Sequence, residues 1–200
     1  MPARDLLLSC QSACRGAAIF FLLGLISCGT SPSISNEKLD PLTGVTVTFV
    51  EAPLILYREN WAKAAYARNL VNMGPIQVNR IGSLRYYLWV GIWSTMRVTE
   101  ISEHRNAFES ILIFADGEPL SLNVIGWTPD SIGLSEPAYL KPVASAVDAY
   151  YEVTVDQIRL IAEATDLRLQ SSGVFPQEFQ LWDQQKMARD DLHEFLRIAF

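Results

Sequence analysis

Apolar residues from position 45 onward fall in short runs, most of which alternate with polar residues as half-buried β-strands do. Residues 45–50 (VTVTFV) alternate β-branched and aromatic types, which predicts a first strand. Residues 84–96 are apolar at even and odd positions alike, so we expect a central strand that is covered on both faces. Asp116 and Gly117 stand between two further apolar runs and predict a tight β-hairpin.

Helical periodicity occurs in three segments. Residues 60–73 place apolar side chains on one face and end before a Gly-Pro pair, which predicts a helix. Thr154 and Gln157 have the spacing of a capping box and predict a second helix from there to about residue 164. The last segment follows Asp183 and has its apolar stripe at Ala188, Leu192, Phe195, Leu196 and Ala199.

These elements define an α+β fold class. We expect an antiparallel β-sheet of roughly six to eight strands, with two or three helices packed mainly on one face. A doubly wound parallel sheet would need helices between most strands, and the middle of the chain lacks them. Half of the 200 residues are apolar, so residues 45–200 can bury the core of a single globular domain.

Charge narrows the range of partners. The chain has 16 Lys and Arg against 22 Asp and Glu, a formal net charge of −6, and contains no basic run. Proteins that bind nucleic acid need a basic surface, so we expect no nucleic-acid partner.

The first 27 residues have the organisation of a secretory signal peptide. Arg4 and Arg15 precede an uninterrupted apolar run at residues 16–25. Ten residues suit the core of a signal peptide, whereas a membrane-spanning helix needs about 20.

The run leads into Leu25-Ile26-Ser27-Cys28, which resembles the lipobox of bacterial lipoproteins. The resemblance implies that a dedicated signal peptidase recognises Leu25, Ile26 and Ser27 and removes residues 1–27. It also implies that Cys28 carries acyl chains, such as palmitate, that hold the protein at a membrane. Gly29, in place of the Asp that signals inner-membrane retention, favours the outer membrane and the periplasm. The alternative is an ordinary cleaved signal or an uncleaved anchor, with Cys28 incidental.

Residues 28–44 are rich in Ser, Gly, Pro and Asn and predict a flexible tether between the lipid and the domain. No cysteine follows Cys28, so the processed domain has no internal disulfide and no thiolate nucleophile.

The sequence lacks the common motifs of catalysis and metal binding. His104 and His193 are its only histidines, and neither belongs to a pair with the spacing of metal ligands. Gly-x-Ser-x-Gly and the glycine-rich phosphate loops do not occur. We therefore expect no catalytic residues, no metal and no cofactor, with an unrecognised hydrolase as an alternative.

Tyr87, Trp89 and Trp93 form an aromatic stripe on one face of the expected central strand, with Gly91 between them. In one interpretation the stripe is core beneath the helices, and Gly91 allows close packing. In the other, it is a partly open groove that binds an apolar ligand or another protein. The sequence thus predicts an envelope lipoprotein with a non-catalytic binding or assembly role and an envelope protein partner. A carrier or sensor of a small hydrophobic ligand is the alternative.

Overall fold

The computed structural model describes residues 35–199 apart from 62–63, 97–104, 174 and 184. The strands in this part of the chain are β1 (Ser35–Leu39), β2 (Thr46–Val50), β3 (Leu54–Glu59), β4 (Arg68–Arg80), β5 (Ser83–Ser94), β6 (Ser110–Ala115), β7 (Glu118–Gly126), β8 (Val147–Val153), β9 (Leu167–Ser171) and β10 (Glu178–Leu181). The helical elements with both ends described are η1 (Pro129–Ile132), a 3-10 helix, and the α-helices α2 (Val155–Glu163) and α3 (Lys186–Ala199).

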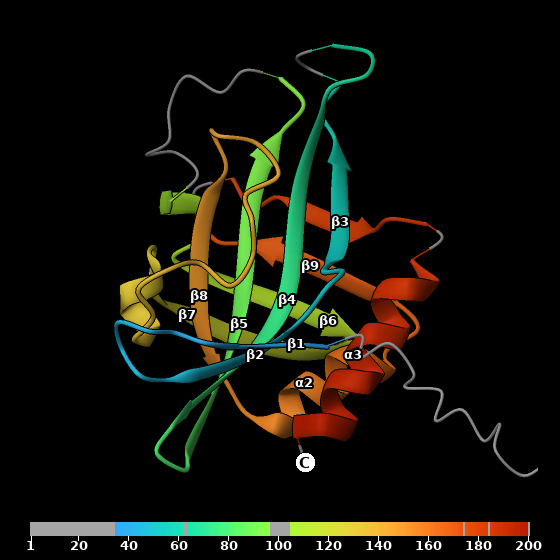
Figure 1. The fold of residues 1–200 in the computed structure, drawn as a ribbon. Helices are drawn as coiled ribbons and strands as arrows, with labels where there is room; N and C mark the ends of the chain where they lie inside the picture. Colours follow the sequence, from blue (N-terminus) through green and yellow to red (C-terminus); the bar gives the residue numbers. More distant parts are fainter. Residues whose placement is uncertain (1–34, 62–63, 97–104, 174, 184, 200) are drawn as a thin grey trace, which may run out of the picture. The chain divides into compact units, whose positions relative to one another are not determined.

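Eight of the strands form a closed antiparallel barrel (Figure 1). Neighbours follow the order β4–β3–β10–β9–β6–β7–β8–β5, and β5 pairs with β4 to close the ring. The predicted sheet with helices on one face is therefore wrong. β4 has thirteen residues, so one of its edges pairs with β3 and then β2, while the other pairs with β5. Sequence periodicity marks the buried positions of each strand. It does not show that β3 and β10, the first and last of these eight strands in sequence, pair with each other.

Apolar side chains fill the interior of the barrel. On β6, Ile111, Ile113 and Ala115 are buried while the side chains between them are partly exposed, which identifies the inward face. The strand register continues this face around the ring through buried residues that include Leu169, Leu56, Val71, Met73, Val90 and Ala149. An eight-stranded barrel is just wide enough for its own side chains to fill it, so the interior is a core.

The helices α2 and α3 pack against each other toward the lower end of the barrel in Figure 1. Ile158 and Ile161 of α2 and Leu192 and Phe195 of α3 are buried there. The predicted capping box of α2 is confirmed, since the Gln157 amide donates to the Thr154 hydroxyl at 3.2 Å and the Gln157 side chain accepts from the Thr154 amide at 2.8 Å.

The helix predicted over residues 60–73 is wrong, because residues 68–73 form the first half of β4. Val71 and Met73 pair with Leu56 and Leu54 of β3 on one side and with β5 on the other. Pairing along both edges outweighs a weak helical pattern in so short a segment. The hairpin predicted at Asp116 and Gly117 is confirmed: both residues have positive φ, 50° and 88°, in the turn between β6 and β7.

Residues 35–44 lie in the segment expected to be a tether, where they form β1 and the turn into β2. Asp40 organises this turn and ties it to the segment after η1. Its carboxylate accepts from the Ser135 hydroxyl and amide, both at 2.6 Å, and from the amides of Leu42 at 3.0 Å and Thr43 at 3.2 Å. These donors, led by the Ser135 hydroxyl, hold the pKa of Asp40 well below its ordinary value, so the carboxylate stays ionised.

Candidate functional site

The predicted aromatic stripe lies on the outer wall of the barrel. Tyr87, Trp89 and Trp93 share the outward face of β5, where they pair with Ile76, Gly74 and Leu70 of β4. Trp89 is only 1% exposed and Tyr87 is buried, while Trp93 is partly exposed. Residues 133–146, which join η1 to β8, cross in front of β5 and β8 and cover this wall (Figure 1). The cover is thus an irregular segment, where a helix had been expected.

A stacked pair of rings forms the centre of this outer layer. Tyr139 from the covering segment stacks on Trp89 with ring centroids 4.6 Å apart and an interplanar angle of 18°. Two glycines make room for the rings. A Cβ on Gly91 would lie 2.6 Å from Cζ2 of Trp89, and a Cβ on Gly74 would lie 2.4 Å from the Tyr139 hydroxyl oxygen. Neither position could hold a larger residue unless a ring moved, so both glycines are needed for this close packing.

Buried polar groups hold the two rings in place. The Trp89 indole N–H donates to Oδ1 of Asp148 at 3.2 Å, and Nζ of Lys141 lies 3.3 Å from Oδ2 of the same carboxylate. Lys141 also donates to the carbonyl oxygen of Ala146 at 3.0 Å. Asp148 is 4% exposed, and a carboxylate so deeply buried requires such partners. The contacts fix the end of the covering segment to β8.

The Tyr139 hydroxyl is a structural group. It donates to the carbonyl oxygen of Pro75 at 2.8 Å and accepts from the amide of Val50 at 3.3 Å, which joins β4 to the end of β2. Burial raises the pKa of Tyr139 above its ordinary value, so the phenol stays neutral at physiological pH. Phe49 packs edge-on against the Tyr139 ring, with centroids 5.4 Å apart.

A groove of about 590 Å³ opens beside this aromatic pair. We call it the Tyr139 groove. It is lined by β1, β2, the turn between β2 and β3, β4 and the covering segment. Its lining residues are Asn36, Phe49, Glu51, Pro53, Asn72, Ala138, Tyr139, Leu140, Lys141 and Pro142. The lining is mostly apolar and aromatic, with one cation and one carboxylate, so it can receive an apolar group and orient a polar one. Leu140, at the edge of the groove, is 88% exposed.

No residue of the predicted stripe lines the groove, but Trp89 and Trp93 each contact a residue that does. Trp89 stacks on Tyr139, and the Trp93 indole N–H donates to Oδ1 of Asn72 at 3.0 Å. Sequence reasoning missed Phe49, Tyr139 and Leu140. Tyr139 and Leu140 belong to a proline-rich segment whose sequence predicts a loop. Nothing in the sequence pattern of this segment indicates that it covers β5.

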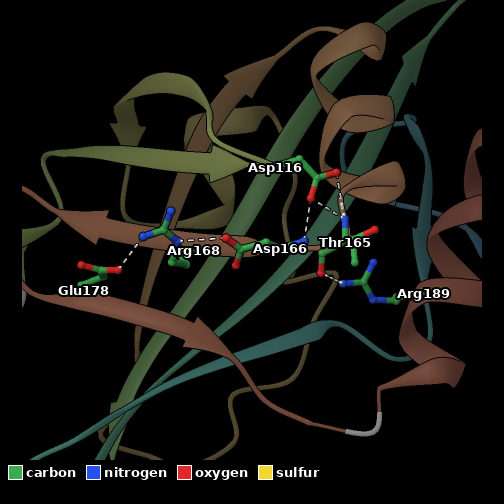
Figure 2. A network of polar contacts seen from close by, with 6 residues as sticks. All are labelled: Asp116, Thr165, Asp166, Arg168, Glu178 and Arg189. Atoms are coloured by element: carbon green, nitrogen blue, oxygen red, sulfur yellow. Dashed lines mark hydrogen bonds and ion pairs between the residues drawn. The ribbon is translucent and has the colours of Figure 1, made fainter.

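A second hollow, of about 430 Å³, lies between β9, β10 and the start of α3 and is more polar. Figure 2 shows the network at its edge. Asp116 accepts from the amides of Thr165 at 2.9 Å and Asp166 at 2.7 Å, and Arg189 of α3 donates to the carbonyl oxygen of Thr165 at 3.1 Å. Arg168 lies between Asp166 at 3.3 Å and Glu178 at 3.2 Å. These groups are already paired with one another, so we interpret the network as a clamp between turns.

The remaining predicted residues lie outside the groove or outside the described part of the chain. Leu25, Ile26, Ser27 and Cys28 lie outside the described residues, as does His104. His193 is exposed on α3, and the described residues contain no group of three or more His, Cys, Asp or Glu that could hold a metal ion. Within the same residues, no helix is long and apolar enough to cross a bilayer.

Comparison with known proteins was made for the whole chain. No protein-family model matches it, and no curated protein and no solved structure matches it significantly.

Proposed function

We propose that this protein is a lipid-anchored, non-catalytic binding protein of the bacterial cell envelope. In this proposal Cys28 carries the lipid, the domain faces the periplasm from the outer membrane, and the Tyr139 groove receives an apolar segment of another envelope protein. The observation that carries the binding role is Leu140, an apolar side chain exposed beside a groove with an ordered aromatic floor.

The floor of the groove is suited to binding because it is held rigid. Tyr139 is fixed by stacking, by close packing against Gly74 and by two hydrogen bonds, so little conformational entropy is lost when a partner packs on it. Glu51 at the groove can pair with a polar group at the edge of an apolar contact.

A small hydrophobic ligand is the second candidate for the groove. The groove has a volume of about 590 Å³, within the range of small-molecule pockets, and its walls are mainly apolar. Because side chains fill the barrel interior, such a ligand would bind on the outer wall.

Capture from native membranes separates the two candidates. C-terminally tagged protein is crosslinked, purified and analysed by mass spectrometry for both proteins and lipids. We expect a stoichiometric protein partner that is lost with Leu140→Asp and retained with Met187→Asp. Met187 is also highly exposed, and an acidic residue in the first turn of α3 is compatible with a helix N-terminus. A small molecule that is lost with Leu140→Asp would support the second candidate. Equal capture by both variants would contradict any role for the groove.

Lipidation is tested separately, by mass and by fractionation. We expect the mature protein to begin at residue 28 with the added mass of a diacylglyceryl group, and Cys28→Ala to abolish processing and lipid mass. A variant with unchanged mass and membrane association would disprove the anchor while leaving the groove proposal standing.

A further inference from the structure

The turn between β4 and β5 forms a finger, residues 80–85, that extends past its neighbours. Pairing of β2 with β4 ends at Asn79, and pairing of β5 with β8 begins at Tyr86. Between these points the chain is a two-stranded ribbon with a two-residue turn, since Arg80 pairs with Ser83. Figure 1 shows this hairpin projecting beyond the other strands at the lower end of the barrel.

The residue at the apex of the finger is unfavourable for the fold. Ile81 has φ 52°, in the left-handed region, and its side chain is 99% exposed. Asn, Asp and Gly are the residues that such a turn favours, whereas a β-branched residue is strained there. Asp116 occupies the equivalent position in the β6–β7 turn and also has positive φ. There its carboxylate accepts hydrogen bonds from two backbone amides. At 99% exposure, Ile81 gains no burial against the described residues that would offset this strain, which points to a contact with another molecule.

The chemistry of the finger indicates what it contacts. Leu84 is 45% exposed, and the exposed residues Arg80 and Arg85 flank the two apolar residues in sequence. The guanidinium of Arg80 lies against Gly133, so Arg85 is the cation available beside the apolar pair. No Asp or Glu occurs between Glu59 and Glu100, although the whole chain has a net charge of −6. Apolar side chains beside an arginine suit the interface of an anionic bilayer, where the former enter the acyl boundary and the latter meets headgroup phosphates.

We infer that the finger is a membrane contact: Ile81 and Leu84 insert into an anionic lipid surface, and Arg85 binds its phosphates. Two apolar side chains offer far less area than the roughly 800 Å² that each partner buries in a typical protein interface. A bilayer needs no shape complementarity, so a small tip is sufficient. Charge also orients the domain on the membrane, because the anionic lipid surface attracts the finger and repels the acidic remainder of the chain. This contact is independent of the Tyr139 groove and of lipidation at Cys28.

The test places a photoreactive amino acid, p-benzoylphenylalanine, at position 81 of the full chain. The protein is reconstituted in vesicles of phosphatidylcholine, alone or mixed with phosphatidylglycerol, and adducts are identified by mass spectrometry after irradiation. Leu42, 82% exposed in the turn after β1, carries the same amino acid as a control. We expect lipid adducts at position 81, enriched in phosphatidylglycerol vesicles, and few at position 42. Arg85→Gln should lower the yield roughly five-fold, the value of one cation at an anionic surface, while Arg105→Gln should not.

Three results would overturn the inference. They are an absence of lipid adducts at position 81, equal yields at positions 81 and 42, and, in native membranes, a protein adduct at position 81 in place of lipid. Because the readout is local to the finger, it is unaffected by loss of the groove partner with Leu140→Asp.

Discussion

Gly74 lies beneath the Tyr139 ring, and Gly74→Ala tests whether this contact holds the floor of the groove. A Cβ at this position would lie 2.4 Å from the hydroxyl oxygen and 2.5 Å from Cζ of Tyr139. Both distances are far inside van der Waals contact, so the phenol has to move. Its movement breaks the hydrogen bonds to the Pro75 carbonyl and from the Val50 amide.

The expected cost follows from three contributions. Overpacking costs about 1–3 kcal/mol, and the two lost hydrogen bonds cost about 1 kcal/mol each. Alanine is favoured over glycine in a strand by about 0.5–1 kcal/mol, which offsets part of this. The net destabilisation of Gly74→Ala is therefore about 3 kcal/mol. In a Tyr139→Ala background the ring is gone, and the same substitution should be neutral or stabilising by about 0.5 kcal/mol.

Urea denaturation of the wild type, the two single variants and the double variant measures this coupling as a double-mutant cycle. We expect a coupling energy of about 3 kcal/mol and, in the single variant Gly74→Ala, loss of the captured groove partner. If the two substitutions are additive within about 0.5 kcal/mol, the contact between Gly74 and Tyr139 does not control the floor, and the reasoning is refuted.

Three further changes test other parts of the structure. Ile81→Asn should raise the free energy of unfolding by about 1 kcal/mol, because asparagine tolerates the left-handed turn; unchanged or lower stability in urea would show that Ile81 is not strained. Two backbone amides hold the pKa of Asp116 below its ordinary 3.8, so its stabilisation is complete above that pH and is lost as pH falls through the lowered pKa. Asp116→Asn should thus lower Tm at neutral pH and approach the wild type in acid; a pH-independent difference would contradict this. Tyr151→Phe removes the 2.6 Å hydrogen bond to the Phe108 carbonyl and should lower the free energy of unfolding by about 1–2 kcal/mol. The buried hydroxyl of Tyr150 has no hydrogen-bond partner among the described residues, so Tyr150→Phe should leave the stability unchanged. Equal losses of stability in urea would contradict this distinction.

Features set by a few neighbouring residues could be predicted from the sequence. The β6–β7 turn depends on the positive φ of Asp116 and Gly117, and the start of α2 depends on two hydrogen bonds between Thr154 and Gln157. The expectation that residues 84–96 form a strand covered on both faces is met by β5, whose central residues are all buried. In each case the information lies within one element.

Features set by contacts between distant segments could not be predicted. Closure of the barrel depends on pairing between strands far apart in sequence, such as β3 with β10, which leaves no mark in the periodicity of either. The groove depends on Tyr139 reaching Gly74 and Pro75, more than 60 residues away, from a segment without regular structure. The aromatic stripe signalled a covered face of β5, but the identity of its cover follows from these long-range contacts alone.

The Tyr139 groove and the finger both involve strand β4, and the distance between them along this strand limits what the groove can bind. β4 carries Gly74 beneath the groove floor and leads to Ile81 at the tip of the finger. Seven residues of extended strand span roughly 23 Å. If the finger touches the bilayer and the ribbon stands away from it, the groove lies well above the headgroups. A membrane lipid would have to leave the bilayer completely to reach this groove, at a cost of about 0.8 kcal/mol for each exposed methylene. A periplasmic domain of another protein meets the groove at that height without such a cost, which is why we favour a protein partner over a lipid ligand.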